Sequence, residues 1–180
     1  MKVRAEAAAT TEEQILAASF QLFREQSYNQ ISLEDIAVQA QVTVQTVIRR
    51  FSSKEQLFRR VCENALNQAI GARDKALVGD INSAVEKLVD HYEKWGDLIL
   101  HFLTQAAQIS VVSQITEIGR TSHHQWIEYT FFPFLENLSP LLRYRRLAQL
   151  IAMTDVHSWK VFRGNLGLSR SETELAFIEV

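Results

Sequence analysis

The chain has 180 residues and a formal net charge of −2. This length suffices for one large domain or two small ones, and the single cysteine, Cys62, excludes an internal disulfide. The first residues lack the apolar run of a signal peptide, and no segment approaches the ~20 apolar residues of a membrane span. We therefore expect a cytoplasmic protein with no membrane partner.

The whole sequence is typical of an all-α protein. Only six glycines and two prolines occur, and no apolar segment shows a sustained two-residue alternation. The first predicted helix covers residues 11–26 and begins with a capping box from Thr11 to Gln14. Its apolar stripe includes Ile15, Ala18, Leu22 and Phe23. Residues 27–30 are predicted to form a turn.

Two short helices and a longer one are predicted next. Ser32 is suited to cap a helix of about two turns, whose inward side carries Leu33, Ile36, Ala37 and Ala40. Thr43 caps the following helix, which has Val44, Val47 and Phe51 on one side. A capping box at Ser53 and Gln56 starts a fourth helix that is expected to end near Leu77.

The second region is also predicted to be helical. Residues 82–108 form a long segment that is apolar on most sides, as expected for a helix in the middle of a domain. Further helices are predicted at 110–118, at 122–138 with a kink at Pro133, and at 141–163. Ser169 is suited to cap a final helix toward Val180. We expect two domains, 1–57 and 58–180.

The second and third predicted helices are joined by a short turn, which is typical of a helix-turn-helix unit. In such a unit the second helix enters the major groove of DNA. If Val47 and Phe51 face inward, the outward side carries Gln45, Thr46, Arg49 and Arg50. Glutamine can pair with adenine, and arginine can bind phosphate or guanine. The N-terminus of the fourth helix, with Lys54, is a candidate phosphate site.

Positive charge is concentrated in this part of the chain. Between Thr43 and Arg60 there are five cationic side chains and one acidic side chain, Glu55. A local basic patch suffices for attraction to the DNA backbone even when the net charge of the protein is negative. A solvated helix face would have a similar composition, so charge alone leaves both interpretations open.

The N-terminal sequence resembles the tetracycline-repressor-like (TetR) family of regulators. The resemblance rests on the segments 15–18, 22–23, 32–37, 42–43, 46–47 and 51–57. It implies that the remainder of the chain is a helical domain for ligand binding and dimerisation. It also implies that the helices near 141–163 and 169–180 pair with their copies in a second subunit.

Four positions depart from the usual pattern of the family. Ser27 and Gln41 stand where glycine is usual, so a positive φ there would cost about 1 kcal/mol. Ile48 replaces a tyrosine that touches DNA, and Arg50 replaces a histidine. Isoleucine cannot donate to a phosphate but can contact a thymine methyl group. We expect these changes to affect the operator sequence more than DNA binding itself. The candidate DNA-contacting residues are Ser32, Thr43, Gln45, Thr46, Ile48, Arg49, Arg50 and Lys54.

Aromatic residues in the second region are candidates for an effector pocket. The candidate ligand-binding residues are His91, Trp95, Phe102, Trp126 and Tyr129, with His123 and Glu128 as further polar contacts. Such a set would suit a small apolar or aromatic effector. The alternative is an ordinary packed core, since aromatic residues at helical spacing are also common there.

The sequence was also compared with the patterns of metal-binding proteins and enzymes. His123 and His124 are adjacent, so a regular helix points them about 100° apart and they cannot share one metal ion. There is no Gly-x-Ser-x-Gly elbow, no phosphate-binding glycine loop and no interpretable partner for Cys62, so we predict no catalytic residue, no metal and no cofactor. We predict a homodimeric repressor that binds a palindromic operator and is released by a small apolar ligand. A helical interaction or ligand-binding protein with a degenerate helix-turn-helix is the alternative.

Overall fold

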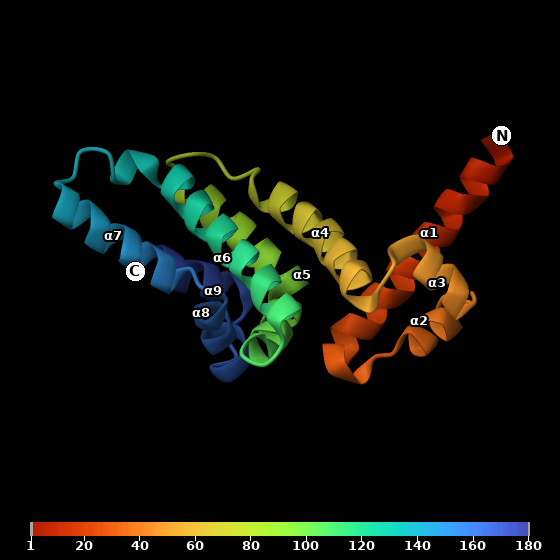
Figure 1. Ribbon diagram of the computed structural model, residues 1–180. Helices are drawn as coiled ribbons and strands as arrows, with labels where there is room; N and C mark the ends of the chain where they lie inside the picture. Colours follow the sequence, from red (N-terminus) through yellow and green to blue (C-terminus); the bar gives the residue numbers. More distant parts are fainter. Residues whose placement is uncertain (1, 180) are drawn as a thin grey trace. The chain divides into compact units, whose positions relative to one another are not determined.

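The computed structural model describes residues 2–179, and all regular secondary structure within that range is helical (Figure 1). The all-α fold class is therefore confirmed. The chain divides into two compact units. Unit 1 comprises Met1–Leu66 and Gln105–Ile115, and unit 2 comprises Asn67–Thr104 and Thr116–Val180.

Unit 1 contains the predicted helix-turn-helix segment. Its elements are α1 (Lys2–Glu25), a 3-10 turn (Tyr28–Gln30), α2 (Leu33–Gln39), α3 (Val44–Phe51) and the first part of α4 (Lys54–Arg73). The end of α5 (Ile81–Ala106) and the start of α6 (Ser110–Thr130) also belong to it. The predicted helix start at Thr11 is wrong, because α1 already begins at Lys2. Alanine is the strongest helix former, and four alanines between residues 5 and 9 favour this extension.

The core of unit 1 holds the short helices in place. Fully or nearly fully buried apolar side chains come from α1, α2, α3 and α4, namely Ile15, Phe23, Ile36, Val47, Leu57 and Phe58. The Phe58 ring packs edge-on against Phe23 at 4.8 Å and against Tyr28 at 5.0 Å. Because α2 and α3 are too short to be stable alone, this burial is what fixes them.

Unit 2 contains the rest of α4, most of α5 (Ile81–Ala106), and most of α6 (Ser110–Thr130). A 3-10 turn (Phe132–Phe134), α7 (Pro140–Met153), α8 (Val156–Lys160), a π-helical turn (Val161–Asn165) and α9 (Arg170–Ile178) follow. The predicted cap at Ser169 is confirmed, since its Oγ accepts a hydrogen bond from the Glu172 N–H at 3.3 Å.

Three predicted helix boundaries in this region are wrong. The helices predicted at 110–118 and 122–138 are one helix, α6, because an isolated glycine such as Gly119 is tolerated inside a helix. Pro133 does not kink a helix but lies in the 3-10 turn after α6, since proline cannot continue the hydrogen-bond ladder. The helix predicted to end near Leu77 ends at Arg73.

The helix predicted at 141–163 is interrupted after Met153. Thr154 Oγ1 donates to the carbonyl of Leu150 at 2.6 Å, and the Asp155 side chain caps α8 by accepting from the His157 N–H at 2.8 Å. Threonine and aspartate compete in this way with the helical hydrogen bonds of the backbone. The apolar periodicity of the segment does not reveal where these side-chain hydrogen bonds interrupt the helix.

The core of unit 2 is built around α5. Leu88, Val89 and Tyr92 are buried together with Trp126, Ile127 and Trp159. Gly96 allows Trp159 to approach α5, since a Cβ at this position would lie 2.5 Å from the Trp159 ring. The close approach explains why glycine is required at this point of an otherwise regular helix.

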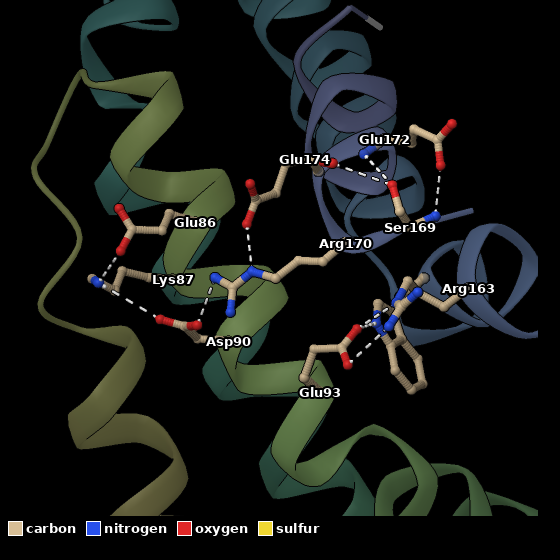
Figure 2. A network of polar contacts seen from close by, with 11 residues as sticks. Glu86, Lys87, Asp90, Glu93, Arg163, Ser169, Arg170, Glu172 and Glu174 are labelled. Atoms are coloured by element: carbon tan, nitrogen blue, oxygen red, sulfur yellow. Dashed lines mark hydrogen bonds and ion pairs between the residues drawn. The ribbon is translucent and has the colours of Figure 1, made fainter. Parts of the chain in front are cut away.

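Ion pairs attach the end of the chain to α5. Figure 2 shows Arg170 between Asp90 and Glu174, at 2.8 Å and 2.9 Å, and Arg163 facing Glu93 at 2.5 Å. These side chains are partly exposed, so each pair contributes at most about 1 kcal/mol. The apolar contacts of Phe177, which is buried and lies edge-on to Phe162 at 5.2 Å, are the stronger anchor of α9.

Candidate nucleic-acid interface

The caps of α2 and α3 form as the sequence predicts. Ser32 and Asp35 make a reciprocal capping box, in which Ser32 Oγ accepts from the Asp35 N–H at 3.1 Å and Asp35 Oδ2 accepts from the Ser32 N–H at 2.8 Å. Thr43 Oγ1 accepts from the Thr46 N–H at 3.2 Å. The candidate DNA residues Ser32 and Thr43 therefore already hold the two helix N-termini in place.

The turn between α2 and α3 is closed by backbone hydrogen bonds. The Gln41 N–H donates to Val38 at 3.1 Å, and the Val42 N–H donates to Ala37 at 2.9 Å. Gln41 has a φ of 55°, whereas Ser27 has a φ of −64°. Of the two residues that replace a family glycine, only Gln41 adopts the left-handed conformation.

The positive φ of Gln41 is expected to lower the stability of the protein. We expect Gln41→Gly to raise the free energy of unfolding by up to about 1 kcal/mol, because glycine adopts a positive φ without steric cost. Gln39→Gly is the matched control, because Gln39 is the last residue of α2. Glycine should lower stability there by about 0.5–1 kcal/mol. Urea unfolding followed by circular dichroism distinguishes these outcomes, and a loss of stability in both variants would contradict the account.

Helix α3 has one buried side and one exposed side. Val47 and Phe51 are buried, and Gln45, Ile48 and Arg49 are exposed, Ile48 by 39%. Thr46 and Arg50 are half-buried, and the hydroxyl of Thr46 lies 2.9 Å from that of Thr43. The exposed side therefore presents an amide, an aliphatic side chain and a guanidinium group, which is a suitable combination for base and phosphate contacts.

Lys54 has a structural role that the sequence does not reveal. Its Nζ donates to the carbonyls of Tyr28 at 3.0 Å and Ile31 at 2.9 Å, and lies 4.3 Å from the centre of the Tyr28 ring. Partial burial lowers the pKa of the Lys54 ammonium. The lysine thus ties the start of α4 to the segment between α1 and α2, with one N–H left for a phosphate.

The candidate effector residues of unit 2 differ in their environments. His91, Trp95 and Trp126 are buried, Phe102 is half-buried, and Tyr129 is 70% exposed. Trp126 belongs to the packed core of the unit. Its ring lies 5.0 Å from the guanidinium of Arg73 and 6.1 Å from His123. Tyr129 lies outside this buried group.

Arg73 is the residue of this region that sequence analysis missed. It ends α4 and is 3% exposed, although arginine at the end of a helix is ordinarily a surface residue. Burial, with Arg73 as a second cause, lowers the pKa of His91 to about 4 and that of His123 to about 3. No sequence signal marks Arg73, since the burial depends on packing between distant segments.

The described residues also bear on metal binding and membrane insertion. No group of three or more histidine, cysteine, aspartate or glutamate side chains that could hold a metal ion occurs among them. None of the described helices combines the length and the apolar character needed to cross a membrane.

The segment from α2 through α3, with the exposed face on α3, has the arrangement of a helix-turn-helix unit. Residues 15–61 match the model of the bacterial regulatory proteins of the TetR family. Over these 47 residues, about a quarter of the chain, the sequence is similar to the N-terminal part of that family. A comparison with curated proteins gave no significant match.

Solved structures share the fold of the whole chain. A transcriptional regulator from Rhodococcus sp. Rha1 is 17% identical, with 92% of this chain and 91% of that chain covered and a TM-score of 0.69. A TetR-family regulator from Streptomyces coelicolor is 14% identical, with 94% and 78% covered and a TM-score of 0.70. A protein from Saccharomonospora viridis, described as a transcriptional regulator in complex with choline, is 15% identical, with 95% of both chains covered and a TM-score of 0.62. All three similar proteins are described as transcriptional regulators.

Proposed function

We propose that this protein is a transcriptional repressor that binds a palindromic operator through α3. The observation that carries the proposal is the exposed face of Gln45, Ile48 and Arg49 on a helix whose opposite side is anchored by Val47 and Phe51. A rigidly held helix can place its side chains against base edges with little loss of conformational freedom. We assign base contacts to Gln45 and Ile48, and backbone contacts to Thr43, Thr46, Arg49, Arg50 and Lys54.

We further propose that the protein acts as a homodimer through its C-terminal helices. Unpartnered apolar side chains support this arrangement. Leu141 and Tyr144 of α7 are 66% and 72% exposed, and Leu175 of α9 is 54% exposed. Exposed apolar side chains on helices are a feature of many interfaces. A two-fold dimer presents two copies of α3 and therefore requires two half-sites in inverted orientation.

Release from DNA is proposed to follow the binding of a small apolar ligand in unit 2. The choline complex of the Saccharomonospora viridis protein supports ligand binding in a protein of this fold. Helix α4 has its first residues in unit 1 and its last residues, Asn67–Arg73, in unit 2. A ligand that displaces the end of α4 would thereby move the DNA-reading helices, with a coupling of about 1–3 kcal/mol.

The proposal is tested by comparing two substitutions on α3. We expect Arg49→Ala to weaken binding to all duplexes and to lower the slope of log affinity against log salt by about one unit, because one phosphate contact is lost. Gln45→Ala should instead relax the preference at one base pair and leave that slope unchanged. Both side chains are exposed, so both variants should keep the unfolding free energy of the wild type.

Fluorescence anisotropy with labelled duplexes over a range of salt concentrations measures both quantities. Glu34→Ala on α2 is a control for an exposed substitution outside α3. If Arg49→Ala changed the sequence preference and left the salt slope unaltered, the assignment of roles would be wrong. If neither variant altered DNA binding, α3 would not be the recognition helix.

A further inference from the structure

Unit 2 contains a buried cluster of polar side chains with incomplete hydrogen bonding. We call Arg73, His91, His123 and Trp126 the Arg73 cluster. They come from α4, α5 and α6, and their exposed fractions are 3%, 9%, 9% and 5%. Arginine and histidine this deeply buried are uncommon, and they are retained where a partner satisfies them.

Arg73 is a buried cation without a carboxylate partner in the described part of the chain. Its Nη2 donates to the carbonyl of Ser122 at 3.2 Å and to the Ser122 hydroxyl at 3.1 Å, while its guanidinium lies 5.0 Å from the Trp126 ring centre. Its Nε–H has no hydrogen-bond partner within residues 2–179. Burial lowers the pKa of the Arg73 guanidinium, and only the electrostatic influence of Tyr92 and the adjacent Asp74 opposes this effect. The positive charge is therefore only weakly compensated, and a buried charge of this kind is strongly unfavourable.

Two further polar atoms of the cluster lack a partner. Trp126 Nε1 and His91 Nδ1 are both buried and unbonded among the described residues. The other ring nitrogen of His91 bonds the backbone of Ala69, so Nδ1 of the neutral ring carries a lone pair. His123 is already satisfied, since its Nε2 lies 3.1 Å from Thr154 Oγ1. The cluster therefore offers two free N–H donors, one acceptor and one positive charge.

We propose that the Arg73 cluster binds the carboxyl group of a small organic acid. The carboxylate oxygens accept from Arg73 Nε–H and Trp126 Nε1–H and compensate the guanidinium charge. The apolar part of the acid lies against the aromatic and aliphatic side chains around α5. This inference rests on the proposed function, in which unit 2 holds an effector, and specifies the chemical class of that effector. A cationic effector is disfavoured here, because Arg73 would repel it.

The test compares organic acids with their amides, which have nearly the same shape but no charge. The probes are benzoate, phenylacetate and a series of straight-chain fatty acids, each paired with its amide. Tryptophan fluorescence and thermal unfolding of the full chain report binding. We expect at least one acid to raise the melting temperature and alter the fluorescence, while its amide has little effect.

Arg73→Met identifies the side chain responsible, with Arg120→Met as the matched control. Arg120 is an exposed arginine that pairs with Glu117 on the surface of α6. We expect Arg73→Met to weaken binding of the acid by about tenfold or more and the control to bind as the wild type does. Without ligand, Arg73→Met should melt at or above the wild-type temperature, because a weakly compensated buried charge has been replaced by an apolar chain.

The proposal is wrong if acid and amide bind equally well, or if no acid of the series changes the melting temperature or the fluorescence. It is also wrong if Arg73→Met binds the acid as the wild type does, or if this variant melts at a lower temperature than the wild type without ligand. The proposed regulatory function is judged separately. If an acid binds but leaves DNA affinity unchanged, the site stands and ligand-induced release fails. If a neutral compound releases DNA, release stands and the acid site fails.

Discussion

The free energy of unfolding of unit 2 is expected to fall as the pH decreases from about 6.5 to about 5. The cause is the pair of buried histidines, His91 and His123, whose pKa values are lowered to about 4 and about 3, chiefly by burial. Arg73 contributes to both shifts, and Asp155 opposes the shift of His123. Both rings are therefore neutral in the folded protein at neutral pH.

The sign of this pH dependence follows from whether the folded or the unfolded state binds more protons. In the unfolded chain both histidines have a pKa near 6.5, so between about pH 6.5 and 4 the unfolded state takes up protons that the folded state excludes. Stability is full above this window and is lost as the pH falls through it. Each histidine contributes up to about 1.4 kcal/mol per pH unit, which amounts to about 2 kcal/mol each at pH 5. The lowered carboxyl pKa of Glu93 acts only at more acidic pH.

Urea unfolding followed by tryptophan fluorescence measures this effect in unit 2 alone, because Trp95, Trp126 and Trp159 all lie there. His91→Gln and His123→Gln should each reduce the pH slope by about 1.4 kcal/mol per unit, and the double variant should remove most of it. A stability that stays constant from about pH 7 to about pH 5 would contradict the neutral, buried state of these rings.

We also expect Phe58→Ala to lower the stability of unit 1 strongly. Phe58 is fully buried and contacts the rings of Phe23 and Tyr28. Removing the ring leaves a cavity between α1 and α4 and should cost about 3–5 kcal/mol. We expect DNA binding to be lost at the temperature at which unit 1 unfolds, while the tryptophan signal of unit 2 keeps a cooperative transition.

Phe132→Ala is the matched control, because this ring is 44% exposed. Its substitution should change stability by no more than about 0.5 kcal/mol. Circular dichroism and tryptophan fluorescence recorded on the same samples separate the two units. Equal destabilisation by the two substitutions would show that the packing of Phe58 against Phe23 and Tyr28 does not hold unit 1 together.

The helix-turn-helix segment was predictable because its signals are local. Ser32, Thr43 and Ser53 mark helix N-termini by a side-chain oxygen that bonds a backbone N–H within three residues, as the structure shows. The inward positions of Val47 and Phe51 follow from the 3.6-residue period alone. The exposed face of α3 was therefore available from the sequence.

Features that depend on distant contacts were not predictable in the same way. Lys54 bonds carbonyls 23 and 26 residues away, and Arg73 bonds Ser122 across 49 residues. The sequence around Lys54 and Arg73 does not indicate which distant groups they will bond. The break at Thr154 was missed for a different reason, because the apolar pattern of 141–163 continues through a site where side-chain hydrogen bonds replace helical ones.

Selection of duplexes from a random pool, followed by sedimentation of the selected complex, measures the preferred DNA sequence and the number of chains bound to it. A dimeric repressor should enrich an inverted repeat whose half-sites lie about one helical turn or a multiple of it apart, with two chains bound. Its affinity for DNA should also fall steeply with salt. Failure to enrich any sequence, or a complex of one chain on a site without two-fold symmetry, would contradict a dimeric repressor that reads DNA through α3.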